Sequence, residues 1–200
     1  MPNCKRFRIP AMSSLVLLLL TFSQAGFAGW TLNSEGSSLY YVTSKAAAIS
    51  ELNTFGELNG AIDDAGNASV AISLASVDTA IDIRNERMRD IVFQVANYPL
   101  AEISLSANGA MLAASNPGQS FMQSYDATIE IGGMQQTMNI ELAVTKLRGG
   151  GLLVSLAKPL IVNAASFGLA ESVEQLREIA GLPSINNNVV IDFTLQFDAQ

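Results

Sequence analysis

Hydrophobic and polar residues alternate strictly along much of the chain. The segments that show this pattern most clearly are 70–75, 103–106, 125–131, 138–145 and 189–198. In the last of them, Ile191, Phe193 and Leu195 alternate with polar residues. Successive side chains of a β-strand point to opposite faces of a sheet. The alternation therefore predicts antiparallel strands with one face buried and the other facing water.

Turn-forming residues separate the alternating segments. They are Asn59-Gly60, Asp64-Ala65-Gly66, Asn108-Gly109, Asn116-Pro117-Gly118, Gly132-Gly133 and Gly149-Gly150-Gly151. Such residues favour tight reversals, and the short spacing between strands favours hairpins. A phosphate-binding loop would need Lys and then Ser or Thr after its glycines, and neither glycine run is followed by them. Hairpin turns are therefore the favoured interpretation.

Two segments break the alternation. Residues 84–93 are charged and then apolar, which suits a short helix or turn. Residues 169–182 place Val173, Leu176 and Ile179 at helical spacing and end near Gly181, which predicts an amphipathic helix. We expect both segments to cover the ends or side of a sheet. Eight to ten short strands then indicate a closed barrel or a sandwich, and a barrel leaves no exposed strand edges.

Composition limits the chemistry of the protein. The 200 residues are 49% hydrophobic and 14% charged, enough for a single globular domain. The net charge of -7 argues against nucleic-acid binding. Histidine is absent, which removes the commonest general base and metal ligand. The single cysteine, Cys4, rules out an intramolecular disulfide. No metal site and no cofactor are predicted.

The N-terminus has the features of a secretory signal peptide. Three basic residues precede the apolar segment 11–22, and Gly26-Phe27-Ala28 offers small residues for cleavage. The alternative is an uncleaved anchor, but a membrane span needs about 20 apolar residues. We therefore predict a signal peptide over 1–28 and one domain over 29–200. The expected mature protein is exported to the periplasm and does not span the membrane. Loss of three basic and no acidic residues would change the net charge from -7 to -10.

No arrangement of residues announces catalysis. A serine–lysine pair would have to use Lys45, Lys146 or Lys158, and we expect each of these lysines to be solvated. Asp63 lies in a predicted turn and Asp78 at a strand end, where carboxylates commonly accept backbone hydrogen bonds. The sequence therefore predicts a protein that is not an enzyme. A hydrolase remains an alternative for which no residue stands out.

Several segments together resemble the YceI family of exported bacterial proteins, which bind polyisoprenoids or other long-chain lipids. The most specific match is Ser76-Val77-Asp78-Thr79, followed by the charged segment 84–89, Phe93 and Asn97-Tyr98-Pro99. Segments 30–45, 54–60 and 165–169 are also similar to the family. The sequence departs from the family pattern at 133–137, which lacks Lys and Pro. It departs again at 164–166, where Ala and Ser replace Arg and Asp.

The resemblance implies an all-β fold: an eight-stranded antiparallel lipocalin-like barrel with one or two short α-helices. Its lumen would hold an apolar lipid, such as an isoprenoid or isoprenoid quinone, for sequestration, transport or storage. A homodimer is also implied, Asp78 and Thr79 would fix a strand exit, and Arg84, Arg87 and Arg89 would lie near one mouth or on a solvated helix face. The expected ligand-binding residues are Tyr41, Phe55, Ile72, Leu74, Phe93, Leu105, Phe121, Tyr125, Ile129, Ile140, Leu142, Phe167 and Phe193.

From the residues alone, these side chains belong either to a lumen or to a packed core. The second functional hypothesis follows from the packed core: a non-catalytic structural barrel that docks a protein partner through an exposed face. Lipid burial is driven by about 25 cal/mol per Å² of apolar surface and needs no specific polar contact. No short motif is therefore expected to mark a lipid site.

Overall fold

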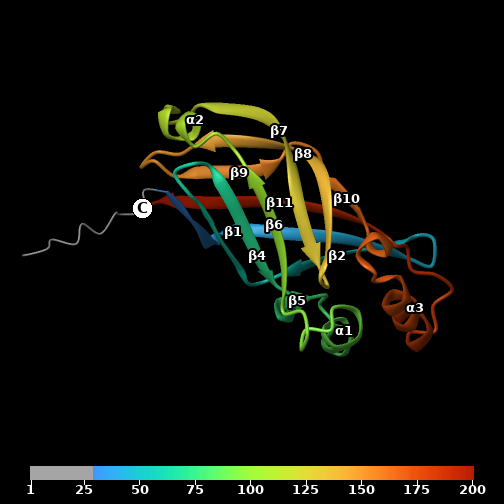
Figure 1. Cartoon of the computed structure of the whole chain (residues 1–200). Coiled ribbons are helices and arrows are strands. Elements are labelled where there is room, and N and C mark those ends of the chain that lie inside the picture. The colour runs from blue at the N-terminus through green and yellow to red at the C-terminus, as the bar shows by residue number, and fades with distance from the viewer. Residues whose placement is uncertain (1–28) are drawn as a thin grey trace, which may run out of the picture.

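The computed structural model describes residues 29–200, and the predicted signal peptide lies outside the described residues. The chain forms eleven antiparallel strands (Figure 1). They are β1 (Trp30–Lys45), β2 (Ile49–Phe55), β3 (Leu58–Ile62), β4 (Asn67–Ser73), β5 (Val77–Asp78), β6 (Leu100–Ser106), β7 (Ser120–Ile131), β8 (Met134–Lys146), β9 (Leu152–Leu156), β10 (Leu160–Asn163) and β11 (Asn188–Ala199).

The strands close into an eight-stranded barrel, as the family resemblance implies. The ring runs β1-β3-β4-β6-β7-β8-β9-β11, and β11 pairs back onto β1 from Trp30↔Ala199 to Val42↔Val190. Alternation sets the two faces of the wall. On β8, for example, Ile140, Leu142 and Val144 are buried and the residues between them are more exposed. Closure leaves most strand edges paired, and most of the inward side chains form one large core, with a second, small cluster at Ile129, Val162 and Phe167.

At three places around the barrel the wall is formed by two consecutive short strands, separated by a kink, in place of one long strand. β2 and β3 both pair with β1 and are separated near Gly56. β4 and β5 lie beside β3 and β2, and β9 and β10 both pair with β11, with Pro159 in the break. As a result β2, β5 and β10 extend the wall at one end of the barrel (Figure 1).

Helices lie at both ends of the barrel. α1 (Asp82–Arg87) continues into a π-helix at Met88–Val92, and α3 (Ala170–Ile179) follows a 3₁₀ turn at Ala164–Phe167. Figure 1 shows α1 and α3 at one end and α2 (Gly109–Ala114) at the other. The helix expected within 169–182 is confirmed, and the segment 84–93, expected to be a short helix or turn, is helical. Among residues 29–200, no helix is long and apolar enough to cross a membrane.

The short helix α2 corrects the prediction of one or two helices. Its first residues, Asn108-Gly109, were expected to form a turn. Instead the Asn108 side chain accepts a hydrogen bond from the backbone N–H of Met111 at 3.0 Å, which caps the helix. Asparagine favours both turns and helix N-caps, so the dipeptide alone does not distinguish them.

One more predicted turn is wrong. Asn59-Gly60 lies within β3, where Gly60 pairs with Val70. A Cβ atom at Gly60 would lie 2.7 Å from the carbonyl oxygen of Ser69, so glycine permits a close approach of two strands here. The other glycine turns are confirmed: Gly132 and Gly133, both with positive φ, join β7 to β8, and 149–151 join β8 to β9.

The ladder between β6 and β7 is short. It consists of Glu102↔Glu130, Ile103↔Ile129 and Ser104↔Thr128, whereas β7 pairs with β8 along its whole length from Ser120 to Ile131. Two glutamates therefore stand directly opposite each other across this ladder. Like charges in this position destabilise strand pairing.

Candidate functional site

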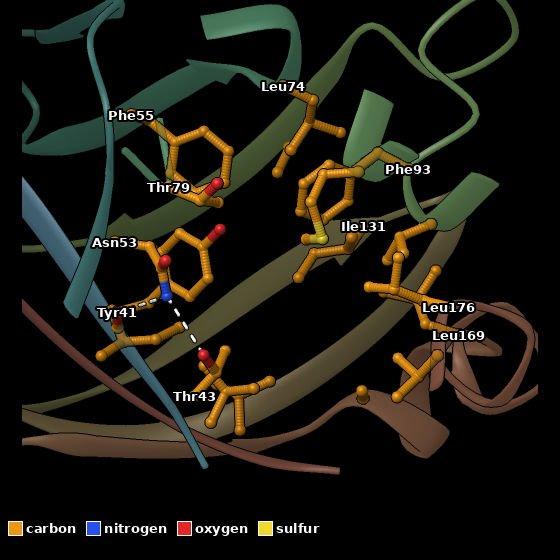
Figure 2. Close-up of a pocket in the computed structure, with 18 of the residues that line it drawn as sticks. Tyr41, Thr43, Asn53, Phe55, Leu74, Thr79, Phe93, Ile131, Leu169 and Leu176 are labelled. Atoms are coloured by element: carbon orange, nitrogen blue, oxygen red, sulfur yellow. Dashed lines mark hydrogen bonds between the residues drawn. The ribbon is translucent and has the colours of Figure 1, made fainter. Parts of the chain in front are cut away.

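An apolar cavity of about 420 Å³ lies in the end of the barrel covered by α1 and α3. Its walls come from the inward faces of the strands, from α1 and the π-helix after it, and from α3. This volume lies within the range of about 300–1,000 Å³ typical of small-molecule sites. Figure 2 shows side chains from these elements facing one another across the cavity.

Eight of the predicted ligand-binding residues line this cavity. They come from seven separate parts of the chain, brought together by closure of the barrel: Tyr41, Phe55, Ile72, Leu74, Phe93, Ile129, Phe167 and Phe193. That they contact a ligand remains a prediction.

The other five predicted residues lie outside the cavity. Leu105, Tyr125, Ile140 and Leu142 line a separate void of about 60 Å³ in the α2 half of the barrel. Phe121 lines neither space and packs, partly buried, against the core. Alternation identifies the inward face of a strand. It does not give the height of a residue along the barrel axis, which depends on how the strands are staggered.

Aromatic rings form part of the cavity wall. The rings of Tyr41 and Phe55 stack with their centroids 5.3 Å apart and an interplanar angle of 27°. Phe93 lies 5.8 Å from Phe55 at a tilt of 50°. These three rings come from β1, β2 and the end of the π-helix, so the contact ties the helical cover to the barrel wall. Such pairs stabilise packing beyond their buried area.

Asn53 and Tyr41 bring buried polar groups into this apolar wall. Asn53 is 4% exposed and donates hydrogen bonds to the hydroxyl of Thr43 at 3.2 Å and to the backbone carbonyl of Tyr41 at 3.5 Å. The Tyr41 side chain is 6% exposed, and its hydroxyl has no hydrogen-bond partner among the described residues. Figure 2 shows this hydroxyl directed away from β1 into the cavity. Burial raises the pKa of Tyr41 well above its usual value, so the hydroxyl keeps its proton.

An ionic cluster stands at the mouth of the cavity. Glu51 Oε2 lies 2.8 Å from Lys45 Nζ and 2.6 Å from Arg84 Nη1. The hydrogen bond from Lys45, followed by the charge of Arg84, lowers the pKa of Glu51. Ile81 and Ile83 line the cavity but are 45% and 52% exposed, which places the opening beside α1.

Of the three arginines expected near a mouth, two line the cavity. Arg84 also donates to the carbonyl of Thr79 at 2.5 Å, and its Nε is buried without a partner among the described residues. Arg87 lies on the cavity wall as well. Arg89, on the π-helix, is not part of that wall.

Asp78 and Thr79 hold the exit from β5, as the family resemblance implies. Asp78 Oδ1 accepts the backbone N–H of Ala80 at 2.8 Å. The side-chain oxygen of Asn85 accepts both the N–H of Thr79 at 2.8 Å and its hydroxyl at 2.6 Å. This network carries the chain from the barrel wall into α1, at a point where Ala80 has a φ of 59°.

Lys146 corrects the expectation that every lysine is solvated. It is 7% exposed, its Nζ donates to the carbonyl of Leu112 at 3.3 Å, and the same atom lies 4.8 Å from the centroid of the Trp30 ring. Burial lowers the pKa of Lys146. The unpredicted helix α2 covers this end of the barrel and supplies the carbonyl. Lys45 and Lys158 instead form ion pairs with glutamates.

Among the residues of 29–200 that line the cavity there is no serine to partner Lys45. Lys45, Glu51 and Arg84 are instead engaged with one another at the mouth. On the α3 side the cavity is lined by apolar residues, among them Ala164, Leu169, Val173 and Leu176.

A closed antiparallel barrel with one packed end and one hollow, apolar end defines a lipocalin-like binding fold. Comparison with protein families is consistent with this class: the family described as the YceI-like domain matches residues 30–197. The chain therefore belongs to the YceI-like family. A search of curated protein sequences finds no significant match.

Three of the solved structures that share the fold come from different bacteria. A polyisoprenoid-binding domain from Saccharophagus degradans, implicated in plant cell wall breakdown, is 33% identical with a TM-score of 0.85, covering 86% of this chain and 99% of that one. BcnA from Burkholderia cenocepacia is 19% identical with a TM-score of 0.62, covering 82% and 98%. The YceI protein of Campylobacter jejuni is 16% identical with a TM-score of 0.53, covering 74% and 84%. The last two similarities concern the fold alone.

Proposed function

We propose that this protein binds an isoprenoid-type lipid in the cavity between β1, α1 and α3. The observation that carries the proposal is an apolar space of about 420 Å³ inside a member of this family. The related domain from Saccharophagus degradans, which binds polyisoprenoids, supports the choice of ligand class. The alternative function, docking of a protein partner, assumes a barrel that is filled with side chains. The α2 half of the molecule is filled in this way, whereas the half with the cavity is not.

The cavity suits a ligand with one long apolar part and one small polar end. Transfer of apolar surface from water is worth about 25 cal/mol per Å², so an enclosed hydrocarbon chain supplies most of the binding free energy. The Tyr41 hydroxyl and the Arg84 Nε are buried donors without a partner in the described part of the chain. An oxygen atom on the lipid would satisfy one of them, and unsatisfied buried donors are costly. We therefore place the polar end of the lipid beside Tyr41 and Arg84.

The proposal is tested by lipid analysis of the protein made with its own leader. The purified protein is extracted with organic solvent and the extract is analysed by mass spectrometry. A long-chain prenol or isoprenoid quinone in stoichiometric amount is the expected result. A clean extract, combined with failure of the lipid-free protein to take up added farnesol, would contradict the proposal.

A matched pair of variants links binding to the cavity. Ala101 on β6 is 6% exposed and lines the cavity, so Ala101→Phe fills part of that space. Ser104, three residues further along the same strand, is exposed, so Ser104→Phe adds a ring outside the barrel. We expect the first variant to weaken farnesol binding at least tenfold and the second to leave it unchanged. Equal affinities for both variants would place the ligand elsewhere.

We further propose that the protein acts in the periplasm as a carrier or store of this lipid. Cell fractionation, followed by detection of the mature chain in each fraction, tests the location. The predicted leader over 1–28 supports export. Sequencing of the mature N-terminus is expected to begin at Gly29. The homodimer implied by the family is a separate proposal, and the molar mass of the protein in solution tests it.

A further inference from the structure

The barrel interior is divided into two unequal spaces that share a few side chains. The cavity of about 420 Å³ and the void of about 60 Å³ have three lining residues in common, namely Leu39, Ile103 and Phe193. These side chains therefore stand between the two spaces. Beyond them, towards α2, the interior is filled by packed core residues.

The three side chains come from opposite walls of the barrel. Leu39 on β1 and Phe193 on β11 are direct cross-strand neighbours, and they are 4% and 5% exposed. Ile103 projects from β6, which lies four positions away from β11 in the eight-membered ring. Four positions is half of the ring, so Ile103 approaches the Leu39–Phe193 pair from the far side of the lumen.

We propose that Leu39, Ile103 and Phe193 form a partition that sets the length of lipid chain the protein encloses. This inference rests on the proposed function and adds a specificity determinant to it. A buried space of about 150 Å³ holds benzene, which has six carbons. At that density, the space of about 420 Å³ holds about 17 carbons, or three to four five-carbon isoprene units. A longer chain must leave its remaining units outside the mouth.

The partition predicts a plateau in affinity with chain length. Each enclosed methylene improves binding about fourfold. In a series of all-trans prenols of 10, 15, 20, 30 and 40 carbons, we expect affinity to rise steeply to 15–20 carbons and then to level off. Titration calorimetry measures the shorter prenols, and displacement of bound farnesol, followed by mass spectrometry, measures the longer ones. Affinity that continues to rise through 40 carbons would contradict the partition.

Variants test whether these residues place the limit. Leu39→Ala and Ile103→Ala, alone and together, remove partition side chains and join the cavity to the void. We expect the double variant to move the plateau about one isoprene unit further and to bind the 20-carbon prenol at least tenfold more tightly relative to the 15-carbon prenol. Leu152→Ala is the matched control, because Leu152 is 1% exposed and lines only the void. It creates a similar loss of packing and should leave the plateau unchanged.

The outcomes separate the partition from the proposed function. A protein that binds none of the prenols contradicts both. A protein that binds them with the same length profile in the wild type, the double variant and the control contradicts the partition alone. If the Ala substitutions prevent folding, the milder substitutions Ile103→Val and Phe193→Leu, which remove less side-chain volume, take their place. The dependence of affinity on chain length in the wild-type protein also tests the partition by itself. A plateau beyond 30 carbons in that profile would overturn the inference.

Discussion

At the scale of single residues, the Tyr41 hydroxyl is the observation that most supports a polar end on the proposed ligand. It is buried, keeps its proton because burial raises its pKa, and has no partner among the described residues. The chain offers an internal comparison. The hydroxyl of Tyr125 is also buried without a partner, but it lies outside the main cavity.

We predict that Tyr41→Phe weakens binding of a prenol by about two- to tenfold, the effect of one neutral hydrogen bond of roughly 0.5–1.5 kcal/mol. Binding of a hydrocarbon of the same length, which has no oxygen, should be unchanged. Tyr125→Phe should change neither. Calorimetric titration of the three proteins with both ligands measures the effect. Equal losses for the alcohol and the hydrocarbon would show that Tyr41 acts only through packing.

A second residue-scale prediction concerns Glu51. The pKa of Glu51 is lower in the folded protein than its ordinary value of 4.5, so the ionised form stabilises the fold above about pH 4.5. That stabilisation is lost as the pH falls through the lowered pKa. Glu51→Gln should therefore lose less stability than the wild type between pH 6 and pH 3, by at most about 1 kcal/mol, because the pairs are partly exposed.

Urea unfolding at several pH values measures this difference. Other carboxylates with lowered pKa values, such as Asp63 and Glu174, are present in both proteins, so the comparison isolates Glu51. Parallel acid profiles for the two proteins would show that the cluster at the mouth contributes no stability.

Residue identity alone predicted part of the site. Alternation placed Ile72, Ile129 and Phe193 on inward faces, and the structure shows them at the cavity. It also placed Ile140 and Leu142 inward, but they lie in the packed half. Alternation has a period of two, so it shows which face of a strand points inward but not where a residue lies along the barrel axis. Asn53, a polar residue on an inward face, was missed because nothing local shows which face of β2 is inward.

At the scale of elements, the helices determine which end of the barrel is hollow. α2 closes one end by inserting Leu112, which is 3% exposed, among core residues. α1 and α3 cover the other end with side chains that line a cavity. No residue of α3 is fully buried. Hydrophobic periodicity predicted α3, whereas α2 is a single six-residue helix, too short to show a period.

We predict that Leu112→Ala lowers the free energy of unfolding by about 2–5 kcal/mol, the usual range for a buried leucine, and leaves lipid affinity unchanged. Leu74→Ala is the comparison, because Leu74 is 2% exposed and lines the cavity. It should affect both stability and binding. Denaturant titration and prenol titration of the folded variants provide the two readouts. A clear loss of affinity in Leu112→Ala would mean that the two ends are coupled.

At the scale of the whole molecule, packing is uneven along the barrel axis. The α2 half is filled, whereas the α1–α3 half encloses about 420 Å³. Regions with few buried contacts open locally at lower free energy than the core. A ligand that fills the hollow half should therefore stabilise it.

We predict that without lipid the amides of α3 exchange with deuterium faster than those of β8, and that bound farnesol slows exchange in α3. At a hundredfold excess of free ligand over the dissociation constant, binding adds about 2.7 kcal/mol of stability, or roughly 5–10 °C in Tm for a domain of this size. Hydrogen exchange and thermal scans test this. Protection in α3 equal to that in β8 without ligand would contradict it.

The short β6–β7 ladder has a consequence for how the protein fails. Only three residue pairs join these strands, and one of them places two glutamates opposite each other. Because like charges weaken strand pairing, we expect β6 and β7 to separate first when the protein is heated. The barrel would then be an open sheet with two unpaired edge strands, and unpaired edge strands promote aggregation. These two edge strands carry exposed polar residues, namely Ser104, Ser106, Ser124 and Asp126. Polar side chains along the edges favour renewed pairing of β6 with β7 in the same chain over pairing with another chain, so unfolding by brief heating should be reversible.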